Sequence, residues 1–210
     1  MASPRQRLSR DAILDAALGI IDDGGLESCT MRAVAADLGV EAMSLYWHVP
    51  GKEALLDGVV ERMLSSAPEF VHHDDWRDEL DGIATSLRDV LMAHPNAVPL
   101  LAGRALGSYA AAGAVVATTL GTLEAAGFER AVAIRAARTV YRYVIGYTLV
   151  ESSVRAAPDG PAPPANPEGS ELLSELADAM ANDPPADLFA FGLQTMLDGL
   201  EASLTRSRPA

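Results

Sequence analysis

The sequence contains little cysteine, few basic residues and no long apolar run. Cys29 is the one cysteine among 210 residues, which excludes an internal disulfide and a cysteine-rich metal site. No stretch approaches the roughly 18 to 20 consecutive apolar residues of a membrane-spanning helix. Residues 1–10 lack the apolar core of a signal peptide. We therefore expect a cytoplasmic protein with no membrane partner.

Motifs of the common enzyme classes are missing as well. There is no phosphate-binding loop, no pair of catalytic carboxylates and no nucleophile elbow. Cys29 and His48 have no third group to orient them as nucleophile and base, so Cys29 is better explained as a small buried residue. The adjacent histidines in residues 72–75 (HHDD) would not face one metal as residues four apart on a helix would. We therefore expect no catalytic residue, no metal site and no cofactor.

The shortage of basic residues gives a net charge of −13, which is unusual for a DNA-binding protein because DNA repels an acidic surface. The acidic excess lies mainly in the second part of the chain. Residues 1–52 carry five basic and seven acidic side chains, whereas the rest carries eleven and twenty-two. Arg5, Arg7 and Arg10 form a basic arm, which either follows a phosphate backbone or is a solvated terminus.

The hydrophobic pattern is that of helices from end to end. Apolar residues recur at three- and four-residue spacing, and no strand pattern appears. Five prolines between Pro158 and Pro167 exclude a helix there and predict a solvated loop over 157–168. The sequence thus predicts an all-α fold of about ten helices. They are expected near residues 9–23, 30–38, 41–48, 52–68, 76–94, 97–101, 108–127, 128–155, 170–181 and 186–204.

Residues 30–52 (TMRAVAADLGVEAMSLYWHVPGK) predict a helix-turn-helix followed by the start of another helix. Thr30 is a good N-cap, and Val34 and Leu38 lie on one apolar face. Gly39 ends this helix because glycine accepts the left-handed conformation of a C-terminal cap.

The second helix of the pair, over 41–48, has only Leu45 as a plainly buried residue. Its exposed side chains suit the major groove, which is about 12 Å wide and admits a helix. Trp47 has an alternative role as part of a small three-helix core. Lys52 begins the next helix, where its ammonium group suits a phosphate.

These residues resemble the tetracycline-repressor (TetR) family of bacterial transcription regulators, and most closely its tetracycline-repressor subgroup. The resemblance is strong over residues 9–64 and stays collinear beyond, and it rests on the run Leu45-Tyr46-Trp47-His48-Val49 followed by Lys52. It implies a helix-turn-helix DNA-binding domain at 1–52 and a ligand-binding and dimerisation domain at 53–210. The implied function is a repressor that binds a palindromic operator as a homodimer and is released by a small molecule.

The resemblance also implies the DNA contacts. Arg32 matches the family's base-contacting arginine, whose fork suits the O6 and N7 atoms of guanine. The glutamine and proline that open the subgroup's recognition helix are replaced by Ala42 and Met43, so an apolar contact takes the place of an adenine contact. We therefore expect an operator of different sequence. The expected DNA-binding residues are Thr30, Arg32, Ala42, Met43, Ser44, Tyr46, Trp47, His48 and Lys52.

Three glycines within the last two long helices, Gly146, Gly192 and Gly199, predict close approach of another element, because an interior helical glycine costs about 1 kcal/mol relative to alanine. In the family, the corresponding helices pair with their copies in a second subunit as a four-helix bundle, so the resemblance implies a homodimer. The alternative is that both helices are buried within one chain.

The residues that hold magnesium-tetracycline in the subgroup are replaced here. Collinear matching places Pro68, Ile83, Leu87 and Leu101 where the subgroup has a histidine, an asparagine, a phenylalanine and a metal-binding histidine. Apolar walls with a few polar groups suit an apolar or aromatic molecule bound without a metal. The expected pocket residues are Leu64, Pro68, Ile83, Leu87, Leu91, Leu101, Arg104, Tyr109 and Tyr141.

Another function class remains open on the sequence alone. A helical small-molecule-binding protein that keeps the DNA-binding module as a relic has the same helix pattern. Selection of genomic DNA fragments with the protein distinguishes the two functions, because only a repressor enriches a palindrome.

Overall fold

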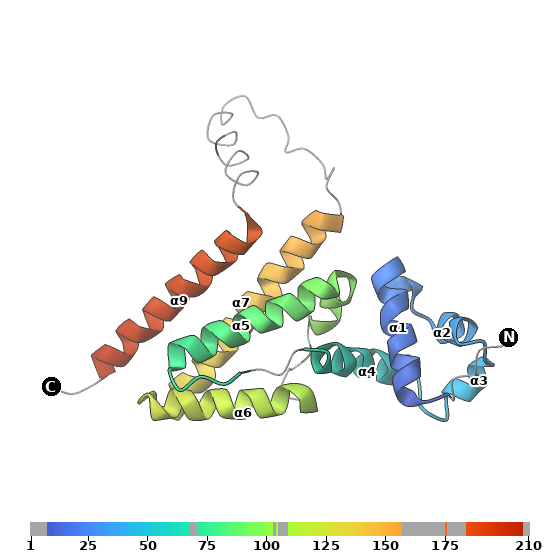
Figure 1. Cartoon of the computed structure of the whole chain (residues 1–210), viewed down its shortest axis with the longest axis horizontal. Coiled ribbons are helices and arrows are strands. Elements are labelled where there is room, and N and C mark those ends of the chain that lie inside the picture. The colour runs from blue at the N-terminus through green and yellow to red at the C-terminus, as the bar shows by residue number, and fades with distance from the viewer. Residues whose placement is uncertain are drawn as a thin grey trace.

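The computed structural model describes residues 8–67, 71–102, 104, 109–156, 175 and 184–207, and every regular element within these ranges is a helix (Figure 1). The prediction of an all-α fold is therefore confirmed. The proline-rich stretch 157–168, most of the helix expected at 170–181, and Arg5, Arg7 and Pro68 lie outside the described residues. The α-helices are α1 (Arg10–Gly24), α2 (Met31–Asp37), α3 (Ala42–Leu45), α4 (Lys52–Ser65), α5 (Trp76–Ala93), α6 (Ala110–Ala125), α7 (Arg130–Ala156) and α9 (Pro185–Ser207), and the 3-10 helices are η1 (Leu26–Ser28) and η2 (Pro95–Leu101).

Polar caps start the first two helices where the sequence predicts them. Ser9 Oγ accepts a hydrogen bond from the Ala12 amide at 3.2 Å, and Thr30 Oγ1 accepts one from the Ala33 amide at 3.1 Å. Such caps satisfy amides that a helix leaves without partners in its first turn. Gly39 has φ +65°, the left-handed conformation expected after α2.

The second helix of the helix-turn-helix is shorter than predicted. It was expected over 41–48, but α3 spans only Ala42–Leu45 and a turn continues to His48. The Leu45 carbonyl accepts hydrogen bonds from both the His48 and Val49 amides, each at 2.9 Å. Pro50 disfavours helical geometry at the residue before it, which explains why the helix cannot continue.

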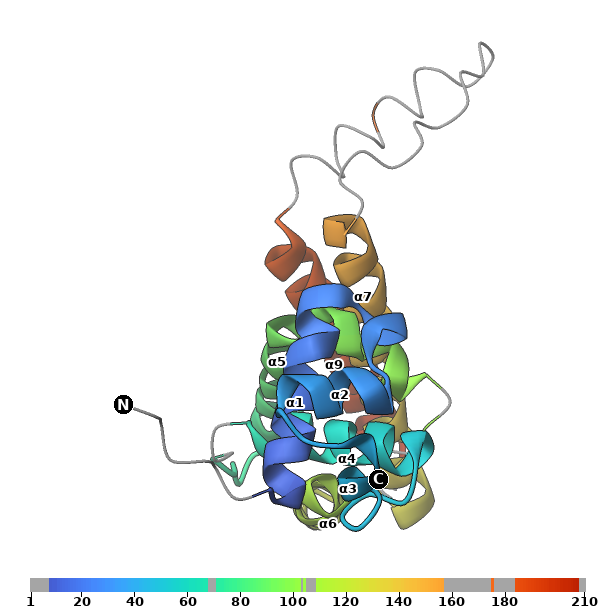
Figure 2. The ribbon, with the colours of Figure 1, turned by 90° about the vertical axis from the view of Figure 1, so that its right-hand side faces the viewer.

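Helices α1, α2 and α3 form one end of the molecule, and α4 leads from them to the larger group of helices (Figures 1 and 2). One face of α4 packs on α1, and it also contacts η2, α5 and α6. Asp22 of α1 joins the two parts directly: its carboxylate lies 2.8 Å from His94 Nδ1, and its carbonyl accepts from Asn96 Nδ2 at 2.8 Å. The predicted division at residues 52 and 53 therefore falls at the start of a helix that belongs to both parts.

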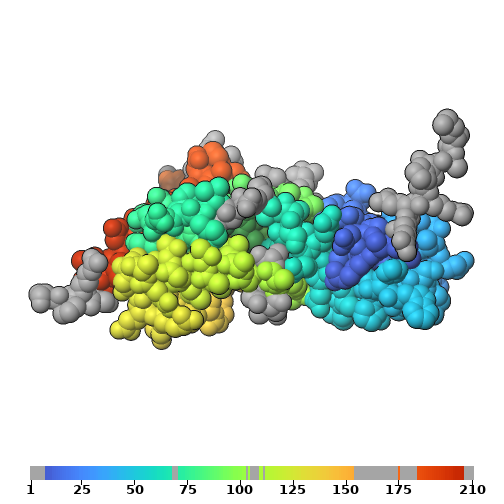
Figure 3. All heavy atoms as spheres, turned by 60° about the horizontal axis from the view of Figure 1, so that its bottom comes forward, coloured from blue at the N-terminus to red at the C-terminus, as the bar shows by residue number. Residues whose placement is uncertain are grey.

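In the larger part, α5 contacts α6, α7 and α9, and the space-filling view shows α5 and α6 side by side (Figure 3). Trp76 at the start of α5 packs edge-on against Phe128, with ring centroids 5.1 Å apart. None of the described helices is long and apolar enough to cross a membrane.

The three glycines expected at close contacts behave differently from one another. A Cβ atom at Gly192 would lie 2.8 Å from Cζ of Tyr143, so α9 does approach α7 closely there, but within the same chain. At Gly146 and Gly199 no described atom lies within 4 Å of an added Cβ. The close approach expected at these two positions is therefore not made by the described chain: Gly146 lines a cavity between the helices, and Gly199 is exposed on α9.

Candidate DNA interface and ligand cavity

The end of the molecule formed by α2, α3 and the start of α4 carries exposed side chains around two buried anchors. Leu45 and Val49 are 0% and 1% exposed and fix the short helix to the core. Met43, Tyr46 and Trp47 are 73%, 46% and 90% exposed. The core role considered for Trp47 is therefore wrong: Leu45 and Val49 already occupy the inward positions, and the indole projects outward. Three large exposed side chains on α3 and the turn that follows it are typical of a surface that binds a partner.

Polar and basic side chains border this helix on both sides. Arg32 on α2 and Lys52 at the start of α4 are exposed, as are Thr30 and His48, while Ser44 is half-buried. The Thr30 hydroxyl accepts from the Ala33 amide, which leaves its proton free to donate to a phosphate oxygen. The arrangement places hydroxyl and cationic donors around an apolar helix, the combination that phosphate contacts and thymine methyl groups require.

Ala42 is half-buried at the start of α3, so its methyl group is less accessible than that of Met43. Cys29 lies beneath the surface, fully buried, and burial raises the pKa of its thiol although the nearby Lys52 lowers it. The prediction of a small buried side chain at Cys29 is confirmed.

A cavity of about 1250 Å³ opens among α4, η2, α5, α6 and α7. This volume exceeds that of a drug-sized ligand site, and most of the lining side chains are apolar. Six of the predicted pocket residues line the cavity, namely Leu64, Ile83, Leu87, Leu101, Arg104 and Tyr141.

Two predicted pocket residues do not line it. Leu91 is fully buried on α5 and packs in the core. Tyr109 is 8% exposed and lies beside Asp57 and Arg104, where burial is the main cause that raises the pKa of its hydroxyl. Both positions were inferred from sequence order along helices, which does not tell which residue of a helical turn faces a cavity.

The wall contributed by α6 was missed. Ala112, Val115, Val116, Thr119 and Leu120 line the cavity from this helix. The segment is rich in alanine, so its inward and outward faces differ little in hydrophobicity and the sequence gives no stripe to follow. Thr119 is the one signal, because a polar residue there breaks the apolar run; its hydroxyl donates to the Val115 carbonyl at 2.8 Å.

Two polar groups at the cavity differ in how they are bonded. The Tyr141 hydroxyl is buried and has no hydrogen-bond partner among the described residues, and burial raises its pKa. A buried hydroxyl without a partner is unfavourable, so a ligand acceptor at this point would be stabilised.

Arg104, in contrast, is bonded on several sides. Its Nε donates to Asp57 Oδ1 at 2.9 Å and its Nη1 donates to the Leu100 carbonyl at 2.7 Å, while Glu53 lies 3.6 Å from Nη2. Asp57 and Glu53 belong to α4, so one residue of the cavity wall is tied directly to the helix that leads to the DNA-binding end.

The two adjacent histidines contact a buried carboxylate of α5. His72 Nδ1 lies 3.0 Å from Glu79 Oε1, and the same carboxylate accepts from the His73 amide at 2.9 Å. Glu79 is fully buried, so these contacts hold residues 72–73 against the start of α5. Across the described ranges no group of three or more His, Cys, Asp or Glu side chains is placed to hold a metal.

Comparison with known proteins gives two family matches that together cover most of the chain. Residues 13–59 match the bacterial regulatory proteins of the tetR family, and residues 71–204 match the tetracyclin repressor-like C-terminal domain. The tetracycline repressor protein class A from transposon 1721 of Escherichia coli is 33% identical over 210 residues, covering 92% of this chain and 91% of that protein.

Solved structures agree with these matches. BioQ with its natural double-stranded DNA operator is 31% identical, with a TM-score of 0.70 over 93% of this chain and 99% of that chain. A variant of TetR from Acinetobacter baumannii AYE, in complex with minocycline, is 30% identical, with a TM-score of 0.73 over 97% of this chain and 98% of that chain.

Proposed function

This chain belongs to the tetR family of bacterial regulatory proteins and is a ligand-responsive DNA-binding transcriptional regulator; from that premise we propose how its own residues carry the activity. The proposal has three parts: a recognition surface for a palindromic operator, a homodimer built on α7 and α9, and an effector cavity that acts on α4. The family is one of transcriptional regulators, not of enzymes. Because its target is bacterial DNA, we place its action in the cytoplasm.

The exposure of the α3 surface carries the proposal for the operator. Met43 and Trp47 are among the most exposed large apolar side chains in the described chain, and Arg32 and Lys52 border them. Arg32 reads a guanine with its bidentate fork, and Lys52 neutralises a phosphate as a point charge. Thr30, Ser44, Tyr46 and His48 add contacts to phosphate and sugar, and Ala42, Met43 and Trp47 meet base edges and thymine methyl groups.

The homodimer is proposed on the outer faces of α7 and α9. Val150 on α7 is 65% exposed, and Leu188 and Phe191 on α9 are 49% and 70% exposed. Gly199 on α9 has open space where a second helix can approach. A two-fold dimer places two copies of α3 about 34 to 36 Å apart, one turn of DNA, which is why a palindrome is expected.

The effector acts through the contact between the cavity and α4. Leu64 lines the cavity from α4 itself, and Arg104 joins the cavity wall to Asp57 of the same helix. A molecule that fills the cavity and displaces these side chains favours a conformation in which α4 holds the recognition helices at another separation. It shifts the equilibrium only by its difference in affinity for the two conformations.

The operator part is tested by selecting genomic fragments with the purified protein and sequencing those retained. A palindrome is expected among them. Arg32→Ala should then cost about 1 to 3 kcal/mol of binding free energy and relax one base position, whereas Lys52→Ala should weaken all sequences alike and lower the salt slope by about one. Equal effects of both substitutions on sequence preference would contradict these roles.

The effector part is tested first with the drug of the subgroup. None of the described residues that line the cavity is a histidine, and Ile83, Leu87 and Leu101 supply apolar groups where the subgroup holds the drug and its metal. We expect tetracycline with magnesium to leave the protein on its operator. Release at micromolar drug would refute an effector bound without a metal.

A further inference from the structure

Three arginines on α7 stand apart from most others in the described chain. Arg62, Arg77, Arg88, Arg104 and Arg130 each form an ion pair with a carboxylate. Arg135, Arg138 and Arg142 are exposed and have no ion pair or hydrogen bond from their side chains to any described residue. The chain has 29 acidic side chains for 16 basic ones, so three unpaired cations on one helix are not explained by a shortage of carboxylates.

Two of the three face the ligand cavity. Arg138 and Arg142 are among its lining residues, whereas Arg135 is not. Arg138 lies four residues after Ile134, three before Tyr141 and seven before Ile145, spacings that place all four on one side of a helix. Ile134 and Val116 line the same cavity and are 37% and 36% exposed, so this side of the cavity reaches the surface.

The cavity therefore has an ordered change of chemistry from inside to outside. The interior is apolar, with the unpartnered hydroxyl of Tyr141 as a hydrogen-bond donor. The outer edge, which we call the arginine rim, consists of Arg138 and Arg142. A neutral apolar molecule would satisfy the interior and leave the two guanidinium groups unused.

We propose that the effector is an amphiphilic anion: an apolar or aromatic body that fills the cavity, with a carboxylate, sulfonate or phosphate group held at the arginine rim. The inference rests on the proposed role of the cavity as the effector site and adds the chemical class of the molecule. A guanidinium group matches such an anion with two parallel N–H donors. Because the rim is exposed, the anion keeps part of its hydration and no isolated charge is buried.

The rim also explains how an acidic protein attracts an anion. With a net charge of −13 the molecule as a whole repels negative ligands. Arg138 and Arg142, which have no carboxylate partner among the described residues, make the electrostatic potential positive within a few ångströms of the cavity edge. Arg104 does not serve this purpose, because Asp57 and Glu53 already balance its charge.

The test uses two fluorescent molecules that share one aromatic body. 8-Anilino-1-naphthalenesulfonate carries a sulfonate, and N-phenyl-1-naphthylamine lacks it. Both are titrated into the full-length protein. We expect both to bind, the sulfonate more tightly at low salt, and its advantage to disappear at about 0.5 M NaCl because screening weakens exposed charge pairs.

Arg138→Ala and Arg142→Ala should each weaken sulfonate binding about threefold to fivefold, the range of an exposed charge pair, and the double variant about tenfold or more. Binding of the neutral amine should not change. Arg135→Ala is the matched control, since it removes the same charge from the same helix outside the cavity, and it should leave both affinities unchanged.

Val115→Trp, which places an indole ring in the cavity from α6, should weaken binding of both molecules and shows that they occupy this site. Thermal unfolding confirms that each variant is folded. If the amine binds in the cavity but the rim substitutions leave sulfonate binding unchanged, or if Arg135→Ala weakens it equally, the anionic effector is refuted while the effector cavity stands. If neither molecule binds, or Val115→Trp changes neither affinity, the cavity is not the binding site and both proposals fail.

Discussion

Replacing Gly58 by alanine tests how closely α4 is set against α1, the contact through which the cavity acts on the DNA-binding end. Gly58 is buried in the middle of α4. A Cβ atom there would lie 2.5 Å from Leu14 Cδ2, 3.1 Å from Leu14 Cδ1 and 3.0 Å from Arg10 Nη2. The Arg10 end can move aside, but Leu14 is 2% exposed and has neighbours on all sides.

Two opposing effects set the magnitude. Alanine in a helix interior is favoured over glycine by about 1 kcal/mol. Adding a methyl group to a filled core costs about 1 to 3 kcal/mol. Gly58→Ala should therefore lower the free energy of unfolding by about 0 to 2 kcal/mol. Gly19→Ala, on the partner helix α1 with nothing within 4 Å of its added Cβ, should raise it by up to about 1 kcal/mol.

Urea unfolding of both variants measures this difference, which we expect to be about 1 to 3 kcal/mol in favour of Gly19→Ala. Relief of the contact moves α1 away from α4, so Gly58→Ala should also bind the operator more weakly. Equal stability of the two variants would show that α1 and α4 are not closely packed at Gly58, and the mechanical link through α4 would lose its basis.

Three further predictions concern the rest of the molecule. Burial raises the pKa of Cys29, so its thiol should resist iodoacetamide at pH 8 in the native protein and react promptly in urea; rapid native alkylation would contradict its burial. Gly199→Glu should split the dimer in sedimentation without unfolding the monomer, because nothing in the described chain lies near this position. Gly192→Glu should unfold the monomer, because Tyr143 lies against Gly192. A dimer that stays intact with Gly199→Glu would rule out an interface at Gly199. Burial raises the pKa of the Tyr141 and Tyr143 hydroxyls above the ordinary value of 10.0, so the unfolded state loses these protons at a lower pH than the folded state. The stability that results is complete below about pH 10 and is lost as the pH rises. In urea unfolding between pH 9 and 11, the free energy of unfolding should therefore fall less for Tyr141→Phe than for the unchanged protein.

The helices and their caps were predictable because each depends on residues close in sequence. Ser9, Thr30 and Gly39 act on amides or carbonyls within a few positions of themselves, and the structure places all three as expected. The length of α3 was not predictable from the apolar periodicity alone, because the residue that limits it, Pro50, lies beyond the periodic positions.

The cavity was only partly predictable because it depends on which side of each helix faces inward. On α5 collinear matching placed Ile83 and Leu87 at the pocket and both line the cavity, but Leu91, expected beside them, packs in the core. On α6 alanine lies on every face, so no stripe pointed to Thr119. The neighbour of Gly192 could not be inferred either, because a glycine indicates a close approach but not the element that makes it; the neighbour is Tyr143 of the same chain.

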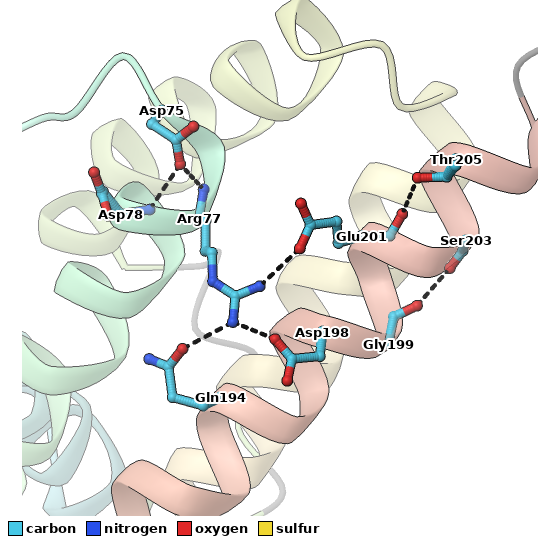
Figure 4. Close-up of polar contacts among 9 residues, drawn as sticks. All are labelled: Asp75, Arg77, Asp78, Gln194, Asp198, Gly199, Glu201, Ser203 and Thr205. Carbon is cyan, nitrogen blue, oxygen red and sulfur yellow. Dashed lines mark hydrogen bonds and ion pairs between the residues drawn. The ribbon is translucent and has the colours of Figure 1, made fainter.

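The last prediction distinguishes two arginines, Arg77 and Arg88 of α5, that bind α9 and α7 respectively. Arg77 reaches across to α9, where Nη2 donates to Gln194 at 3.0 Å and also bonds Asp198, and Nη1 donates to Glu201 at 3.3 Å (Figure 4). Among the described residues Arg88 makes one ion pair, with Nη2 at 3.0 and 2.9 Å from the two carboxylate oxygens of Glu151 on α7.

Arg77 makes more bonds than Arg88, but the Arg88 pair is more deeply buried, so we expect the loss of its carboxylate to destabilise the fold more. Asp198 is 69% exposed, and Arg77 keeps two partners without it, so Asp198→Asn should cost under about 1 kcal/mol. Glu151 is 5% exposed and Arg88 15%, with the guanidinium 5.2 Å from the Phe189 ring centroid and its Nε already without a partner among the described residues. Glu151→Gln leaves that charge buried and unbalanced, which should cost about 3 kcal/mol. Urea unfolding of the two variants, each exchanging a carboxylate for an amide of the same shape, decides between them. Similar losses would mean that Arg88 is solvated in solution, and that α7 and α9 are held to α5 by their apolar faces alone.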